Sequence, residues 1–275
     1  VRIERETKKI HYKNHVTTVK NLPMGIDTDI IKSMYHPEEK ESLLRIIIKS
    51  MLGNNVEKTG IEAYFEQYRV ILGIDRMDYT KGLPARLHAI DTFFQEYPQY
   101  IGKLIYLSIL APSREKIPAY QQLKQEVLKL GEEINNKYMK NNWKPIQFIF
   151  NKFPRNELIN FYSKADVCLI TPLDDGMNLV SKEFVISSSF SDNPGMLVLS
   201  QFAGSATDLS SSLIVNPYDT HEVSKAIKTA LEMPKKEKSA RIKNMVDILE
   251  ERNIYDWGKN FARMTESAAK DNGIG

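Results

Sequence analysis

The chain has 275 residues, 42% of them hydrophobic and 27% charged, which is typical of a globular protein with one large domain or two small ones. Its formal net charge of +3 is small and is not concentrated in a block of Lys or Arg, which argues against nucleic acid or a membrane surface as a partner. One cysteine cannot form a disulfide or a zinc site, and no apolar run is long enough to span a bilayer, so we expect a cytoplasmic protein.

The N-terminal part of the chain predicts only short elements. Residues 1–15 are polar and charged, and no element is predicted there. Val16–Pro23 alternates as a strand does, and Asp27 or Thr28 is placed to cap a short helix over Asp29–Met34. Two further predicted helices span Glu38–Met51 and Ile61–Tyr68.

From Arg69 onward, apolar runs alternate regularly with segments of helical spacing. The predicted strands are Arg69–Ile74, Lys103–Leu110, Ile146–Phe150, Asp166–Thr171, Met196–Ser200 and Leu213–Val215. The predicted helices are Leu83–Tyr97, Ala119–Tyr138, Arg155–Tyr162, one that starts at Met177, Asp219–Leu231, Lys235–Leu249 and Tyr255–Ala269. This alternation indicates βαβ units, and strands that are apolar on both sides indicate a sheet covered on both faces. We therefore predict an α/β fold, a Rossmann-like domain with a mainly parallel sheet.

The stretch Thr171–Glu183, TPLDDGMNLVSKE, joins a buried strand that contains Cys168 to the helix that follows. In an open α/β sheet such a turn is a usual place for a nucleotide, because backbone N–H groups at the helix N-terminus face the phosphates. Glu183 falls about two turns into the predicted helix, where its carboxylate could accept hydrogen bonds from the hydroxyls of a ribose. An ordinary turn with a solvated Glu183 fits the pattern equally well. Cys168 is predicted to be a core residue.

Two cations follow the first strand of this alternation. Arg76 and Lys81 lie on the loop Asp75–Gly82 and could together grip a diphosphate, Arg with a planar fork of donors and Lys with a point charge. The alternative is that both are solvated and paired with Asp75 and Asp78, as surface ion pairs commonly are.

Three more loops are predicted at the same edge of the sheet. Arg114 could bind an anionic group or simply be solvated, and Phe153 could flank a flat base or belong to the core. The turn Ser200–Ser205 contains Gly204 and could let the backbone approach a ligand closely, or be a plain tight turn. The five histidines show no metal-ligand spacing, and the motifs G-x-S-x-G and Gly-Lys-Ser/Thr are absent from the sequence.

Five segments together carry a close resemblance to the trehalose-6-phosphate synthases of glycosyltransferase family 20. They keep that family's order and spacing over nearly the whole chain. The segments are Leu22–Asp27, Gly73–Ile90, Thr171–Val185, Val198–Leu209 and Leu213–Asp219.

The resemblance implies the C-terminal half of a GT-B glycosyltransferase, in which two Rossmann-like domains face each other. It implies transfer of glucose from UDP-glucose to glucose 6-phosphate with retention of configuration, giving trehalose 6-phosphate and UDP, without a metal or another cofactor. Residues 1–22 would be the end of an N-terminal acceptor domain, and residues 23–275 the donor-binding domain with C-terminal helices. Since the rest of the acceptor domain is missing, we expect the isolated chain to be inactive. We also expect it to self-associate as a homo-oligomer through the face meant for that domain.

The resemblance also implies roles for single residues. Arg76 and Lys81 would hold the donor diphosphate and act in catalysis together with Asp175, which would contact the glucosyl hydroxyls. Glu183 would hold the ribose, and Arg114 would reach the phosphate of glucose 6-phosphate. The other donor-binding positions are Gly176, Met177, Asn178, Leu179 and Val180, through their backbone, and Phe153 and Leu158 at the base.

The implied mechanism is a front-face displacement, in which the leaving diphosphate helps to deprotonate the incoming hydroxyl. Asp174 and Asp175 are adjacent, so their side chains diverge and do not form the close carboxylate pair of a retaining glycosidase. Two other functions stay open: a nucleotide-sugar-binding or regulatory homologue without activity, and a related enzyme with another acceptor such as glycerol 3-phosphate. The base of the donor nucleotide is open as well.

Overall fold

The computed structural model describes residues 1–35, 68–141 and 143–271 of the chain. The helices expected at 38–51 and 61–68 fall outside these ranges, apart from Tyr68. Of the two expected caps, Asp27 and Thr28, the structure has Asp27 as the N-cap of α1 (Thr28–Ser33). Its side chain accepts a hydrogen bond of 2.9 Å from the Ile30 N–H.

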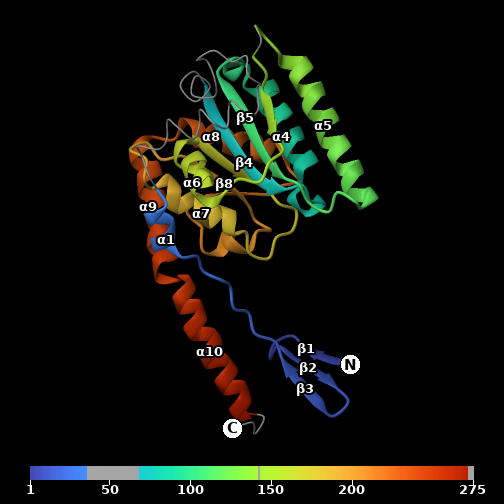
Figure 1. Cartoon of the computed structure of the whole chain (residues 1–275), viewed down its shortest axis with the longest axis vertical. Helices are drawn as coiled ribbons and strands as arrows, with labels where there is room; N and C mark the ends of the chain where they lie inside the picture. The colour runs from blue at the N-terminus through green and yellow to red at the C-terminus, as the bar shows by residue number, and fades with distance from the viewer. Residues whose placement is uncertain (36–67, 142, 272–275) are drawn as a thin grey trace.

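A six-stranded sheet forms the centre of the molecule (Figure 1). Its strands are β4 (Arg69–Arg76), β5 (Leu104–Ala111), β6 (Ile146–Ile149), β7 (Val167–Ile170), β8 (Met196–Ser200) and β9 (Leu213–Val215). They lie in the order β6-β5-β4-β7-β8-β9, and every pair of neighbours is parallel. The predicted parallel sheet is confirmed.

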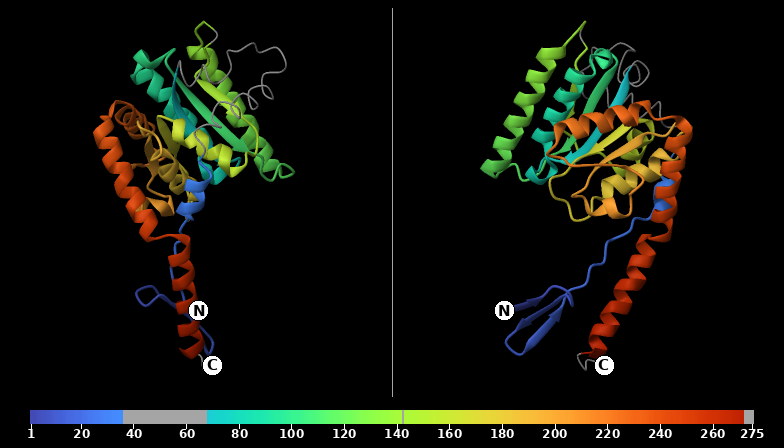
Figure 2. Two further views of the ribbon diagram at one scale, coloured as in Figure 1. Left: turned by 60° about the vertical axis from the view of Figure 1, so that its left-hand side comes forward. Right: turned by 180° about the vertical axis from the view of Figure 1, so that it is seen from behind.

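Helices cover both faces of this sheet (Figure 2). On one face, α4 (Leu83–Glu96) packs between α5 (Pro118–Tyr138) and α8 (Thr220–Glu232). On the other face lie α6 (Arg155–Lys164) and α7 (Leu179–Ser188), and α7 also contacts α1 (Thr28–Ser33) and α9 (Lys235–Glu251). All residues of β7 and β8 are buried, which is the expected result for parallel strands covered on both sides. Cys168 in β7 is a fully buried free thiol, so its prediction as a core residue is confirmed.

The strand order contains a switch point between β4 and β7. The chain builds outward from β4 through β5 to β6, returns to the centre, and then builds outward again from β7 to β9. The helices that follow β4 and β7 therefore pass to opposite faces of the sheet. The loops at the carboxyl ends of these two neighbouring strands meet at the place where ligands bind in open α/β sheets.

A small sheet of β1 (Arg2–Glu4), β2 (Lys9–Tyr12) and β3 (His15–Thr18) stands apart from this domain. It is antiparallel and extends from the same end of the molecule as α10 (Ile254–Asp271) (Figures 1 and 2). The sequence missed β1 and β2, and it placed the strand Val16–Pro23 too far along the chain. Strands of three or four largely exposed residues bury no face, so no alternation of apolar and polar residues is required. In the described ranges, no helix combines the length and the apolar character needed to cross a membrane.

Candidate functional site

Two loops meet at the switch point and are held together by their backbones. The Leu173 N–H, after β7, donates to the Thr80 carbonyl, after β4, over 2.8 Å. Gly82 ends the short 3-10 helix η2 (Tyr79–Lys81) with a left-handed φ of 65°, and a Cβ at this position would lie only 2.8 Å from the Thr171 carbonyl oxygen. The loops can come this close because residue 82 has no side chain.

An ion pair joins the same two loops at the surface of the site. The Lys81 ammonium lies 2.5 Å from the Asp175 carboxylate, and the two side chains are only 13% and 15% exposed. The predicted alternative, Lys81 paired with Asp75 or Asp78, is wrong. Asp75 pairs with Arg86, and Asp78 accepts hydrogen bonds from Thr80 at the start of η2.

Asp175 also organises the turn that leads into α7. Its carboxylate accepts hydrogen bonds from the Asn178 backbone N–H at 3.1 Å and from the Asn178 side-chain amide at 3.0 Å. Burial acts to raise the pKa of Asp175, but the hydrogen bond and charge of Lys81, with the bonds from Asn178, outweigh it and lower the pKa. Asp175 is therefore a stable anion at neutral pH. Its neighbour Asp174 is exposed, so the two carboxyl groups do not form a pair.

The helix α7 begins at Leu179, two residues later than predicted, because Asn178 is its N-cap. Asn178 has a φ of 61°, and its side chain accepts a hydrogen bond from the Ser181 N–H. Residues Gly176, Met177 and Asn178 therefore belong to the turn before the helix, and Leu179 and Val180 form its first turn. The Ser181 N–H is taken by this cap, and the Leu179 and Val180 N–H groups of the first turn are suited to bind an anion.

The turn at Ser200–Ser205 packs against the Asp175 loop and is joined to it by backbone hydrogen bonds. The Gly204 N–H donates to the Asp175 carbonyl over 2.8 Å, and a Cβ on Gly204 would lie 2.0 Å from the Gly176 carbonyl oxygen. The close approach at Gly204 is to another loop of the protein, and an approach of this turn to a ligand stays a prediction. The turn continues into the 3-10 helix η4 (Gly204–Thr207).

Arg76 is the last residue of β4 and is exposed. Within the described ranges, no ion pair or side-chain hydrogen bond occupies its guanidinium. The alternative that pairs Arg76 with Asp75 or Asp78 is therefore wrong too. Arg76 at the end of β4 and Lys81 at the end of η2 are five residues apart in the chain, at the sheet edge that also carries Asp175.

Glu183 is the fifth residue of α7 and is not a solvated glutamate. Its carboxylate lies 2.8 Å from the Arg155 guanidinium, and its side chain is 16% exposed. Burial raises the pKa of Glu183, and the Arg155 charge only partly opposes this effect. Arg155 starts α6, so the pair links the two helices on one face of the sheet.

Phe153 and Leu158 flank Arg155 in the chain, and both pack into the core. Phe153 is 9% exposed and contacts the Phe161 ring edge-on, with centroids 5.5 Å apart. Leu158 is partly buried against the same core. Their assignment to a base-binding position stays a prediction.

Arg114 lies on the loop after β5, with a left-handed φ of 47°. It is not simply solvated, because its guanidinium donates to the Tyr120 hydroxyl over 2.9 Å. That hydroxyl lies 3.4 Å from the Asp78 carboxylate, so one tyrosine connects the Arg114 loop to the start of η2.

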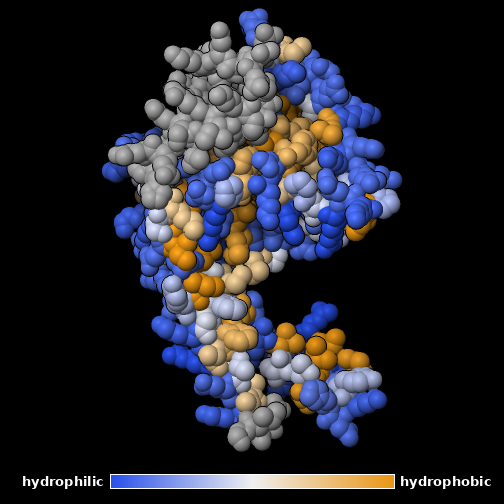
Figure 3. Space-filling view, in the orientation of Figure 1, coloured by the Kyte–Doolittle hydropathy of each residue, from blue (hydrophilic) through white to orange (hydrophobic). Residues whose placement is uncertain are grey.

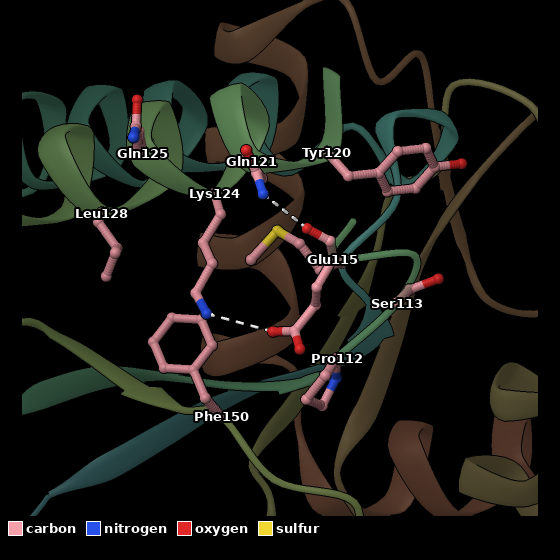
Figure 4. Close-up of a pocket in the computed structure, with 10 residues that line it drawn as sticks. Pro112, Ser113, Glu115, Tyr120, Gln121, Lys124, Gln125, Leu128 and Phe150 are labelled. Carbon is pink, nitrogen blue, oxygen red and sulfur yellow. Dashed lines mark hydrogen bonds and ion pairs between the residues drawn. The ribbon is translucent and has the colours of Figure 1, made fainter. Parts of the chain in front are cut away.

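An open cavity of about 500 Å³ lies beside this loop, between the end of β5 and α5 (Figure 4). Figure 4 shows Lys124 above the Phe150 ring, with its ammonium 3.4 Å from the Glu115 carboxylate. The cavity is lined by Met77, Pro112, Ser113, Glu115, Tyr120, Gln121, Lys124, Gln125, Leu128 and Phe150. The predicted donor-binding residues do not line this cavity.

Sequence reasoning missed Arg86, a fully buried arginine beneath the two loops. It donates hydrogen bonds to Asp75, Thr171 and the Lys81 carbonyl. A signal was available, because Arg86 lies three residues after Leu83 and four before Ile90, on the apolar face of the predicted helix. A charged side chain on a buried helix face must be paired, so its presence there predicts buried polar partners beneath the two loops.

Among the described side chains, no group of three or more His, Cys, Asp or Glu is placed to hold a metal ion. Arg76, Lys81 and Arg114 all contribute positive charge at this edge of the sheet.

Comparison with known proteins places this geometry in a family. The family model described as Glycosyltransferase family 20 matches residues 1–267. A trehalose-6-phosphate synthase from Klebsiella pneumoniae is 44% identical over 191 residues, which are 70% of this chain and 40% of that protein. An alpha,alpha-trehalose-phosphate synthase [UDP-forming] from Candida albicans is 34% identical over 254 residues, 92% of this chain and 50% of that protein.

Solved structures agree with these relatives. One from E. coli, described as trehalose-6-phosphate bound with UDP-2-fluoro glucose, has a TM-score of 0.81 and 34% identity, covering 94% of this chain and 54% of that one. A UDP-forming alpha,alpha-trehalose-phosphate synthase from Burkholderia xenovorans in complex with glucose-6-phosphate has a TM-score of 0.83 and 32% identity, with the same coverage. The chain spans half or less of the length of the curated relatives named above.

Proposed function

Because the chain belongs to glycosyltransferase family 20, we propose that it is the donor-binding half of a UDP-forming trehalose-phosphate synthase. The complete enzyme would transfer glucose from UDP-glucose to glucose 6-phosphate with retention of configuration, giving trehalose 6-phosphate and UDP. The observation that carries the proposal is the Lys81–Asp175 pair, which joins the two loops at the switch point. Arg76 ends the strand that leads into the first of these loops, and its guanidinium has no ion-pair partner among the described residues. Cations and a carboxylate at one sheet edge suit a substrate that joins a diphosphate to a sugar.

Each side chain has a task in this proposal. An ammonium has three N–H donors, so Lys81 can bind Asp175 and a phosphate oxygen together, while Arg76 offers its planar fork to the same diphosphate. Asp175, held as an anion, accepts hydrogen bonds from the glucosyl hydroxyls. The backbone from Gly176 to Val180 borders the sugar and the phosphates, and Glu183 holds the ribose.

The proposed reaction needs no metal or other cofactor. As the bond to glucose breaks, negative charge grows on the leaving diphosphate, and fixed cations stabilise that charge best when they are already in place. Lys81 meets this condition because Asp175 holds its side chain. We further propose that Phe153 and Leu158 contact the uracil base of the donor and that Arg114 binds the phosphate of the acceptor. The protein would act in the cytoplasm.

We propose that residues 1–22 belong to a preceding acceptor domain and residues 23–275 to the donor domain. Figure 3 shows apolar patches on the N-terminal sheet, where Ile3, Val16 and Val19 are exposed. Phe261 on α10 is also 53% exposed. Such apolar surface is suited to cover by another domain, and in the isolated chain it favours self-association into a homo-oligomer.

The test uses a protein in which this chain follows an acceptor domain of the same family. It should release UDP from UDP-glucose only when glucose 6-phosphate is present, and NMR of the product should show an α,α linkage. Nucleotide binding without transfer would instead identify a regulatory or binding module. Equal turnover with glycerol 3-phosphate would identify another acceptor, and an inverted linkage would rule out the proposed mechanism.

In the same protein, Glu183→Gln should raise the KM for UDP-glucose by roughly 10- to 100-fold and leave kcat nearly unchanged. A hydrogen bond to a charged group contributes about 1.5–3 kcal/mol, and the ribose contact is the same in the ground state and the transition state. Steady-state kinetics measure both constants. Glu237→Gln is the matched control, since Glu237 forms a similar ion pair with Arg241 on α9 and should change neither constant. A loss of kcat in Glu183→Gln at an unchanged KM would contradict the ribose assignment.

A further inference from the structure

Arg86 connects every segment that meets at the switch point. Its guanidinium donates to the Asp75 carboxylate at 2.5 Å, to the Thr171 hydroxyl at 2.9 Å and to the Lys81 carbonyl at 3.2 Å. A longer contact of 3.4 Å reaches the Tyr106 hydroxyl on β5. The side chain is fully buried, so it does not itself touch a substrate.

The positions of these acceptors matter more than their number. Asp75 comes just before Arg76 at the end of β4, and Lys81 closes the same loop, so Arg86 holds that loop at both ends. Thr171 comes directly after β7, where the chain starts toward Asp175. One buried side chain therefore fixes both loops, beneath the Lys81–Asp175 pair that joins them at the surface.

Only an arginine can make this set of contacts. Its planar fork presents five N–H donors in fixed directions, whereas a lysine offers a single point charge at the end of a flexible stem. A lysine at residue 86 could pair with Asp75 but could not also reach the Lys81 carbonyl and the Thr171 hydroxyl in the same geometry. The charge would be kept, and the spacing between the two loops would lose the support that Arg86 adds to the Leu173–Thr80 backbone hydrogen bond.

We propose that Arg86 is a positioning residue of the donor site, which sets where Lys81 and Asp175 stand relative to each other and to Arg76. This inference rests on the proposed function, because the diphosphate of the donor is what the positioned cations would bind. The Lys81–Asp175 pair alone does not fix the spacing of the loops, since the four-carbon stem of the lysine can adjust to a shift of its backbone while the ammonium stays at the carboxylate.

The test compares Arg86→Lys with Arg69→Lys in the isolated chain. Arg69 begins the same strand, pairs with Asp166 at 3.1 Å and donates to the Leu231 carbonyl at 2.8 Å. Like Arg86, Arg69 bonds a carboxylate and a backbone carbonyl, although its side chain is 36% exposed. It lies about 23 Å from Arg76 along an eight-residue strand of about 3.3 Å per residue. Calorimetry would give the dissociation constants of UDP and of uridine for both variants, and thermal melting would show that they are folded.

Arg86→Lys should weaken UDP binding by roughly 10-fold, the lower end of what loss of an outer-shell partner costs at metal sites. Uridine lacks the diphosphate, so its affinity should stay the same, and Arg69→Lys should change neither ligand. Thr171→Val, which keeps the side-chain shape and removes one acceptor, should act in the same direction with a smaller effect, and it replaces Arg86→Lys if that variant does not fold. An unchanged ratio of UDP to uridine affinity in the folded variant overturns the inference.

A second readout needs no nucleotide. NMR titration of the Asp175 carboxyl in the free chain should show a higher pKa in Arg86→Lys than in the parent, because a displaced Lys81 lowers that pKa less. Arg69→Lys should leave the titration unchanged. If the parent chain does not bind UDP, the proposed function fails, and the titration still decides the positioning role. An unshifted Asp175 in a folded Arg86→Lys protein overturns that role.

Discussion

Lys81→Ala in the two-domain enzyme should lower kcat by about 10²–10³, with a smaller effect on the binding of UDP-glucose. UDP-glucose already carries diphosphate charge, so part of the Lys81 contact is made equally in the ground state. More charge collects on the leaving oxygen as the glycosidic bond breaks, and only that increase speeds the chemical step. Loss of one donor aimed at such charge costs about 2.7–4 kcal/mol. Arg76→Ala should lower kcat by a factor in the same range.

Two comparisons make this kinetic prediction specific. Arg76→Lys should restore only part of the rate, because a point charge does not reproduce a planar fork. Lys152→Ala, which removes an exposed lysine from the loop between β6 and α6, two strands away from β4, should leave the rate unchanged. Steady-state kinetics on all four variants decide the matter. A Lys81→Ala enzyme with an altered KM and a normal kcat would mean that Lys81 binds donor without stabilising the leaving group.

Arg86→Met should destabilise the chain by about 3–5 kcal/mol at neutral pH, because it leaves the Asp75 carboxylate buried without its counterion. Chemical denaturation followed by circular dichroism measures this loss. The effect should exceed that of Lys81→Ala, since the Lys81–Asp175 pair retains access to water. Equal losses in the two variants would show that the buried pair contributes nothing special to stability.

The cost of Arg86→Met should also depend on pH in a definite direction. Burial raises the pKa of Asp75, and in the parent the charge of Arg86 opposes that rise. Without Arg86 the folded-state pKa lies further above the unfolded value, so the folded variant binds a proton that the unfolded chain does not. Stability of the variant should then increase as the pH falls toward the unfolded pKa of about 4, and the difference from the parent should narrow. A difference that widens between pH 8 and pH 5 would contradict this account.

The periodicity of the sequence predicted the sheet because burial on both faces of β7 and β8 demands continuous apolar residues. It did not predict β1 and β2, where no burial imposes a pattern. The edge that carries Arg76, Lys81 and Asp175 followed from strand ends, which a parallel sheet gathers on one side. Their pairing did not follow, because Lys81 and Asp175 are 94 residues apart and pattern tells only whether a residue is buried.

For Arg86 too, the sequence pattern reported burial but not the partners of the buried group. Its place on the apolar face of the α4 sequence indicated a buried charge. Its hydrogen-bond partners, however, come from β4, β5, the residue after β7 and the short helix η2, which the sequence alone does not bring together. Glu183 was found as a candidate, while its ion pair with Arg155 depends on how α6 packs against α7. Local sequence thus identified which side chains carry charge at this edge, and the tertiary fold decided which of them meet.

The central claim, a nucleotide-diphosphate site on this chain that needs no metal, is tested most directly by titrating the isolated chain with UDP in excess EDTA. Calorimetry should show saturable binding that does not change when EDTA is replaced by Mg²⁺, and that is strongly weakened in Lys81→Ala. Absence of binding, or binding only with the divalent cation present, would contradict the account.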